Sequence, residues 1–214
     1  MSTITHLQAT VGPDNNNPGS GANEAVRRSP SGGLYSADIS ARYQEAVLRG
    51  NVYGVANQVG VTSQAGLSAT TPVLSLYNPK ASGVDAVLWY ASGQMAVANV
   101  AAAAVWLAVN TDTTAAATTG TATTTHRNML LGASAANKCS PLLAATLPAA
   151  PVALCTLGIG LTGAITVATQ APTMDRWFDG GVIVKPGAAI SIQTSTASGA
   201  AGLWCELIWE EIPA

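Results

Sequence analysis

Near its last residue the chain reads Leu203-Trp204-Cys205-Glu206-Leu207-Ile208-Trp209-Glu210. Every second position, beginning with Leu203, is apolar, and the positions between them carry Trp204, Glu206, Ile208 and Glu210. Successive side chains of a β-strand point to opposite faces of a sheet. The alternation therefore predicts a strand whose buried face carries Leu203, Cys205, Leu207 and Trp209.

Short segments of the same kind precede this strand. They cover residues 52–58, 71–77, 84–91, 105–109, 161–168, 182–184 and 190–192. Turn-forming residues separate them, as in Asn78–Gly83 and Lys185–Gly187. Because no helical crossover lies between the strands, we expect an all-β fold, an antiparallel β-sandwich of the jelly-roll type.

Two stretches inside this region are harder to assign. Ala96–Ala108 is rich in alanine, a poor strand former, so a helix is an alternative there. Its Val and Trp residues fall on alternate positions, which favours a strand. Residues 110–125 are rich in Thr and Ala and are expected to form a polar loop or a hairpin.

The chain before residue 51 has a different character. Residues 1–36 contain many turn-forming residues and are expected to form an extended N-terminal arm, either a loose tail or a strap that orders on a partner. Residues 37–50 are expected to form one short helix. Its apolar stripe contains Tyr43 and Val47, and Gly50 takes a left-handed conformation after its end. Residues 51–214 then form the sandwich domain.

Charged residues are scarce. Asp, Glu, Lys and Arg make up 9 % of the chain, against about 25 % in a typical soluble domain. None lies between Cys139 and Met174. A monomer with so few charges would be poorly soluble, so we expect neighbouring subunits to cover much of the surface. The net charge of −2 offers no basic footprint for nucleic acid.

Membrane insertion and a cysteine framework are both disfavoured. The apolar run Val152–Ala168 is interrupted by Gly and Thr and has no flanking Lys or Arg cluster, so we expect no membrane span. The first ten residues lack the features of a secretory signal. Cys139, Cys155 and Cys205 are odd in number and widely spaced, which predicts buried reduced thiols made in a reducing cytosol.

The sequence contains no strong motif for catalysis or cofactor binding. Gly158–Gly163 matches a phosphate-binding fingerprint, but a β-pattern follows it, so the glycines are expected in a strand or bulge. His6 and His126 are the only histidines, and neither has a nucleophile beside it. Glu206 and Glu210 would lie roughly 13 Å apart on one strand face, too far apart for a glycosidase pair. They are expected to meet a neighbour's cation or solvent. We therefore expect no catalytic residue, no metal site and no cofactor.

Two groups of residues are candidates for contacts. Asp175, Arg176 and Asp179 surround Trp177 and Phe178, a pattern that favours an aromatic anchor with an ion pair over a ligand pocket. A second group, rich in Tyr and Arg, leads into the sandwich. Its members are Arg27, Arg28, Tyr35, Arg42, Tyr43 and Tyr53. Tyr and Arg are favoured at interfaces. Packing of the arm on its own sandwich is the alternative.

Four segments together carry a family resemblance. They are Ala41–Gln58, Leu74–Gly83, Lys185–Ile192 and Leu203–Glu211. With their turns and strand patterns the chain resembles structural proteins of tailed-bacteriophage virions. The nearest likeness is to β-sandwich decoration, cement and fibre-base proteins, which are commonly trimeric. The resemblance spans residues 41–211 and brings no catalytic residue with it.

The resemblance implies a non-enzymatic virion protein assembled in the cytoplasm of the bacterial host. We expect a capsid decoration or cement protein that stabilises the head through its arm and through self-association as a homotrimer. Its partners would be copies of itself and the major capsid protein or another virion protein. The alternative is a tail or fibre component whose loop at 110–127 contacts the host receptor. A glycan hydrolase, the third class, would need converging carboxylates.

Overall fold

The computed structural model describes residues 8–10, 23–25, 43–96, 103–111, 117–123, 125–160, 174–198 and 200–214. The chain divides into two compact units, Met1–Gly50 and Asn51–Ala214. The second unit begins where the sequence predicts the sandwich domain.

The first unit contains two short strands and one helix. Strand β1 (Gln8–Thr10) pairs antiparallel with β2 (Asn23–Ala25), so part of the predicted extended arm is a two-stranded ladder. Helix α1 (Gln44–Leu48) is shorter than the predicted one, whose first residues lie outside the described part. Gly50 has a φ of 74°, as predicted for the residue that ends the helix.

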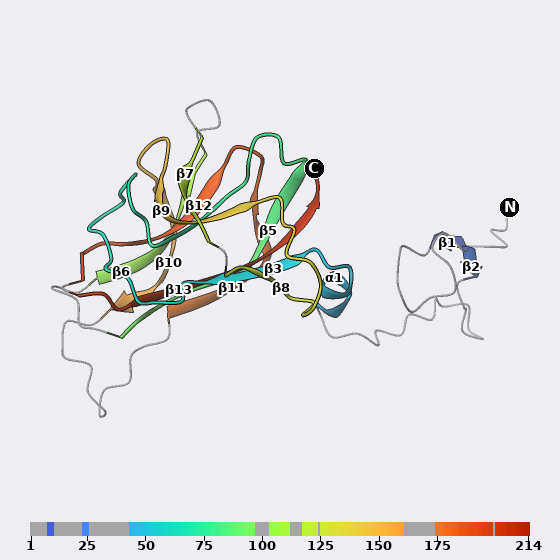
Figure 1. Ribbon diagram of the computed structural model, residues 1–214, viewed down its shortest axis with the longest axis horizontal. Helices are drawn as coiled ribbons and strands as arrows, with labels where there is room; N and C mark the ends of the chain where they lie inside the picture. The colour runs from blue at the N-terminus through green and yellow to red at the C-terminus, as the bar shows by residue number, and fades with distance from the viewer. Residues whose placement is uncertain are drawn as a thin grey trace, which may run out of the picture. The chain divides into compact units, whose positions relative to one another are not determined.

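The second unit is a sandwich of two antiparallel sheets (Figure 1). Its strands are β3 Val52–Ala56, β4 Leu74–Tyr77, β5 Val84–Met95, β6 Ala103–Asn110, β7 Thr119–Ala122, β8 Arg127–Asn128, β9 Ser140–Thr146, β10 Val152–Gly160, β11 Met174–Val184, β12 Ala189–Thr194 and β13 Leu203–Pro213. One sheet has the order β10-β6-β12-β4-β9-β7, and the other has the order β11-β5-β13-β3-β8.

This strand order is that of a jelly roll. Four antiparallel pairs are nested in the sequence: β3 with β13, β4 with β12, β5 with β11 and β6 with β10. Two further pairs, β6 with β12 and β5 with β13, join the nested hairpins into two sheets. The prediction of an antiparallel, jelly-roll-like sandwich is thus confirmed. The alanine-rich stretch contributes strand β6 rather than a helix.

The segment between β6 and β10 adds to both sheets. Strand β9 pairs with β4 and β7 pairs with β9, which widens one sheet. Strand β8 pairs with β3 and widens the other. The expected loop or hairpin at 110–125 therefore contains an edge strand, β7, in the part that the structure describes. In that part of the chain, no helix is both long and apolar enough to span a bilayer.

The core lies between the sheets and follows the alternation of β13. Leu203, Leu207 and Trp209 are fully buried, and Cys205 is nearly so, as predicted. Trp209 stacks on Tyr53 of β3 with ring centroids 5.8 Å apart. Because both rings come from adjacent strands, they fasten β13 to β3 beyond their ladder of hydrogen bonds.

One end of the sandwich is held by two turns that interlock. Asn78 follows β4, is fully buried, and donates from Nδ2 to the carbonyl oxygens of Val84 and Val184, at 2.7 and 2.8 Å. Gly187 donates its backbone N–H to the carbonyl of Asn78 at 2.7 Å. Both turns are the ones predicted from Asn, Pro and Gly, and Gly83 and Gly187 have φ values of 70° and 94°.

Candidate self-association surface at the β10–β11 edge

The feature of interest is one open side of the sandwich. Strand β10 ends one sheet and β11 ends the other, and the two strands contact each other. At Gly158 the two strands are so close that a Cβ atom would lie 2.5 Å from Cγ of Met174. A side chain on residue 158 would therefore push the two sheets apart. This confirms a strand position for the first glycine of the fingerprint, whose last glycine lies outside the described residues.

Large apolar side chains are exposed along both strands. On β10 the exposed fractions are 67 % for Val152, 49 % for Leu154 and 62 % for Ile159. On β11 they are 52 % for both Trp177 and Ile183. Single exposed apolar residues are ordinary on a protein surface, but Val152, Leu154 and Ile159 lie along one edge strand. We call these three residues of β10 the edge patch.

Irregularities in both strands disfavour the addition of a further strand. The pairing of β10 with β6 shifts register between Ala153 and Cys155 and again between Thr156 and Gly158. The pairing of β11 with β5 is interrupted between Trp177 and Val182. Such bulges break the row of backbone groups that an incoming strand would need. A partner is therefore better able to contact this edge through side chains than to extend the sheet by backbone hydrogen bonds.

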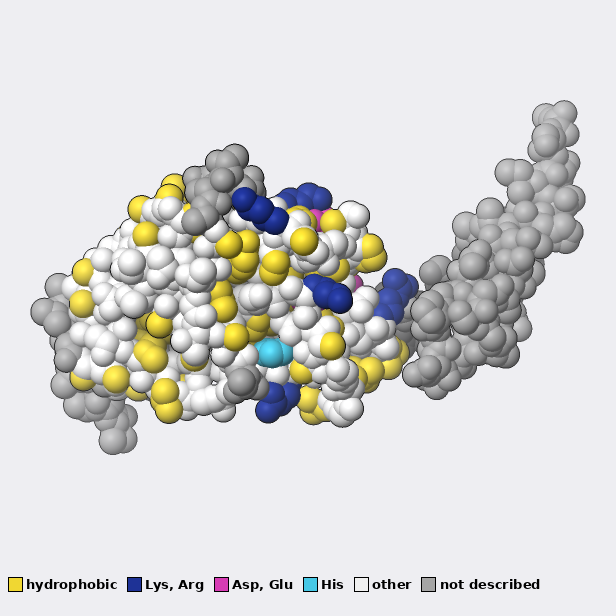
Figure 2. Space-filling model, turned by 45° about the horizontal axis from the view of Figure 1, so that its top comes forward, with side chains coloured by type: hydrophobic (Ala, Val, Ile, Leu, Met, Phe, Trp, Pro, Cys, Tyr) yellow, Lys and Arg dark blue, Asp and Glu magenta, His cyan; other side chains and the backbone are white. Residues whose placement is uncertain are grey.

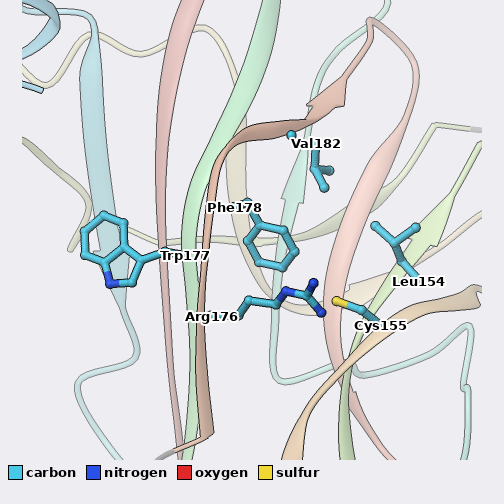
Figure 3. A pocket seen from close by; sticks show the side chains of 7 residues that line it. Leu154, Cys155, Arg176, Trp177, Phe178 and Val182 are labelled. Atoms are coloured by element: carbon cyan, nitrogen blue, oxygen red, sulfur yellow. The ribbon is translucent and has the colours of Figure 1, made fainter. Parts of the chain in front are cut away.

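The interruption in β11 opens a groove between the two strands (Figure 3). It has a volume of about 340 Å³ and is lined by Leu154 and Cys155 of β10 on one side and by Arg176, Trp177, Phe178, Gly181 and Val182 of β11 on the other. The guanidinium carbon of Arg176 lies 5.5 Å from the centroid of the Phe178 ring. This cation–π contact holds a positive charge beside the apolar side chains that line the groove.

The aromatic residues of β11 point in different directions. Phe178 faces the groove, whereas Trp177 turns to the other side of the strand (Figure 3). There Trp177 packs against Tyr90 of β5, with ring centroids 4.9 Å apart. The predicted aromatic anchor is therefore present. The bulge of β11 opens a pocket in this region, and Arg176 lies over an aromatic ring.

Charged residues are unevenly divided between the two edge strands, since β10 has none and β11 contains Asp175, Arg176 and Asp179. On the face shown in Figure 2, hydrophobic side chains are spread among uncharged polar ones, with several Lys and Arg side chains between them. In the described part of the chain, no three His, Cys, Asp or Glu side chains are grouped as metal ligands would be.

The residues predicted for the interface fall in different places. Tyr53 is only 6 % exposed and packs in the core, so it has little surface to offer a partner. Tyr43 is half-buried next to α1, and its carbonyl oxygen accepts a hydrogen bond from Val47 N–H at 3.1 Å. The remaining predicted residues, Arg27, Arg28, Tyr35 and Arg42, lie outside the described residues.

The edge patch was not predicted from the sequence as a contact surface. Val152, Leu154 and Ile159 all lie in the uncharged stretch between Cys139 and Met174, which indicated a covered surface without showing which side chains face outward. The signal that could have located them is the strand order, because the last nested pair of a jelly roll places β10 at an edge.

The carboxylates of β13 have separate environments. Glu206 is half-buried on the outer face, and burial raises the pKa of its carboxyl. Glu211 is buried, and it accepts hydrogen bonds from the backbone N–H groups of Lys138 and Cys139, both at 2.8 Å. Glu211 also accepts one from Trp209 Nε1 at 3.2 Å. It therefore acts as a structural acceptor that fastens the segment before β9 to β13.

The three thiols are unpaired, and two of them are buried. Burial raises the pKa of both the Cys139 and the Cys205 thiol, and the negative charge of Glu211 raises that of Cys139 further. Cys155 is half-buried and lines the groove. The prediction of buried thiols thus holds fully for two residues and in part for the third.

Comparison of the chain with protein-family models, with curated proteins and with solved structures finds no match.

Proposed function

We propose that this chain is a non-enzymatic structural protein of a bacteriophage virion, a decoration or cement protein that binds the capsid. Two features support the proposal beyond the resemblance of the sequence. The jelly roll is an architecture used by viral capsid domains, among others. A fold alone does not define a function, so the proposal depends on the exposed residues at the edge of the sandwich.

The observation that carries it is the edge patch. Val152 and Ile159 are 67 % and 62 % exposed in the isolated chain, and Leu154 of the same strand lines a groove of about 340 Å³. Apolar surface of this kind gains free energy when a partner covers it, at about 25 cal/mol per Å². A second copy that inserts apolar side chains into the groove would cover it, and a closed ring of three copies would bury all three edges.

The N-terminal segment supplies the second part of the proposal. Sandwiches associate through their edges, and residues 1–36 of each copy lie across a neighbouring capsid subunit. Area buried across subunit boundaries then stabilises the assembled head. If residues 1–36 become ordered only on binding, attachment waits until the assembled capsid shell offers a groove that they fit.

Binding to capsids that lack the protein tests both parts. Purified full-length chain is mixed with such capsids, and the bound fraction is measured by co-sedimentation over a range of concentrations. We expect deletion of residues 1–36 to weaken binding by about tenfold or more, because it removes the strap. Equal binding by the deleted and the intact chain would contradict the strap.

Copy number in the virion tests the location. Quantitative mass spectrometry of purified particles gives the ratio of this chain to the major capsid protein. Hundreds of copies per particle are expected of a shell component, since it decorates repeated capsid sites. Tens of copies or fewer would contradict the decoration role and would indicate a tail or fibre component.

A further inference from the structure

The outer face of the β11-β5-β13-β3-β8 sheet carries two neighbouring rows of side chains. The first row crosses three strands through Trp177, Tyr90 and Ile208, which are partners in the ladders. The second row, two residues along each strand, contains Asp175, Ser92 and Glu206. We call them the aromatic row and the acidic row. Adjacent rows on one face are separated by roughly 7 Å.

The aromatic row presents a firm and partly exposed ring surface. Trp177 is 52 % exposed, and its ring lies 4.9 Å from that of Tyr90 at an interplanar angle of 49°. Each ring thus limits the movement of the other. On the other side of the acidic row, Trp204 follows on β13 with 38 % of its surface exposed. Aromatic groups therefore flank the acidic row on both sides.

The acidic row presents carboxylates that lack a cation. Within the described residues neither Asp175 nor Glu206 forms an ion pair. Their strands are two positions apart in the sheet, with β5 between them, so the two carboxylates are roughly 10 Å apart. Beside Glu206 the face continues over the small residues Ala56 and Gly54 of β3, and the Met129 side chain lies over Gly54.

From this arrangement we infer that the outer face binds an uncharged glycan built of gluco-configured pyranoses. Equatorial hydroxyls leave the axial C–H groups of such rings free to stack on Trp177 and Tyr90. The hydroxyl groups at the ring edge donate hydrogen bonds to Asp175 and Glu206, which accept them without a partner cation. Anionic sugars are disfavoured because the acidic row repels them.

A protein partner fits this face less well. The centre of a protein interface is depleted in charged residues, and its polar groups lie at the rim. Here the carboxylates lie between Trp177 and Trp204, at the middle of the aromatic surface. Trp177 borders the groove, but its ring turns to the other side of the strand (Figure 3). The inference does not rest on the proposed role in the capsid, since the edge patch contains no residue of the two rows.

Titration calorimetry of the full-length chain tests the inference. The probes are cellohexaose, maltohexaose and chitohexaose, with hexagalacturonate as the anionic counterpart. We expect saturable binding of at least one uncharged probe and none of hexagalacturonate. Trp177→Ala and Tyr90→Ala should each weaken binding by about tenfold or more. Ile183→Ala is the matched control, because Ile183 is equally exposed on the same strand but outside both rows.

The outcomes separate clearly. Absence of saturable binding for all three uncharged probes, or unchanged affinity in Trp177→Ala, would overturn the inference, even if the face then proved to bind a protein. Should Trp177→Ala fail to fold, the double variant Asp175→Asn and Glu206→Gln keeps the packing and should still weaken binding. Sedimentation of each variant shows whether self-association persists, so failure here and failure of the proposed function are distinguishable.

Discussion

Lys185 Nζ lies 2.5 Å from Asp85 Oδ2 and joins the end of β11 to the start of β5. The Lys185 side chain is 67 % exposed, whereas that of Asp85 is 9 % exposed. Within the described residues, the second carboxylate oxygen of Asp85 is buried without a hydrogen-bond partner. The ion pair is therefore the main compensation for a carboxylate taken out of water at the end of the sandwich.

Lys185→Ala should destabilise the fold by about 1 kcal/mol, because it leaves Asp85 buried without a counter-charge. Solvent screening of the exposed lysine keeps the effect moderate. Urea unfolding monitored by tryptophan fluorescence measures it. Lys138→Ala, which removes a lysine of similar chemistry outside this pair, serves as the control. Equal stability of both variants and the natural chain would contradict the role of the ion pair.

Glu211→Gln should destabilise the fold by about 2 kcal/mol. The amide that replaces the carboxylate keeps one acceptor oxygen, so it cannot satisfy the three donors of Lys138, Cys139 and Trp209 together. Urea unfolding gives the difference in the free energy of unfolding. A Glu211→Gln variant as stable as the natural chain would argue against this network.

Glu206 gives stability a dependence on pH. Burial raises the pKa of its carboxyl in the folded chain above the ordinary value of 4.5. The folded chain thus binds the carboxyl proton of Glu206 more tightly than the unfolded chain does. The protonated carboxyl therefore favours the folded state below pH 4.5, and this contribution to the free energy of unfolding is lost as the pH rises through the raised pKa. Glu206→Gln should therefore be more stable than the natural chain at neutral pH. Melting temperatures at acid and neutral pH check this, and an advantage that is the same at both would contradict it.

Thiol reactivity should single out Cys155. Cys139 and Cys205 are each 2 % exposed and have raised thiol pKa values, so both should resist labelling in the folded chain. With a disulfide reagent, a dilute solution should show one fast thiol, and Cys155→Ser should abolish that phase. Fast labelling that survives in Cys155→Ser would mean that a core strand opens readily.

The sequence was sufficient for several strands and their buried faces, but it did not predict β9, the first part of β11 or which strands lie at an edge. The inward residues of β13 follow from their alternation, and the turns at Asn78 and Lys185 follow from their residue types. Which strands lie at an edge depends on pairings between segments far apart in the chain. The exposure of Val152 and Ile159 could therefore not be predicted locally.

Tyr53 is the opposite case, a residue that the sequence predicted at an interface and that the structure places in the core. Its neighbourhood, rich in Tyr and Arg, is typical of an interface, yet the ladder of β3 with β13 places its ring on Trp209 in the core. A tyrosine in a strand can face either way, and residue type alone does not decide the face. The aromatic and acidic rows also depend on register, because Trp177, Tyr90 and Ile208 become neighbours only when three strands align.

Self-association through the edge patch is the central claim, and sedimentation equilibrium of the intact chain tests it most directly. The double variant Val152→Asp and Ile159→Asp places charges on the patch. Val59→Asp is the matched control, because Val59 is as exposed as Val152, at 67 %, but follows β3. We expect three times the monomer mass for the natural chain and for Val59→Asp, and the monomer mass for the double variant. A natural chain that stays monomeric at high concentration, or a double variant that keeps the mass of the natural chain, would contradict the claim.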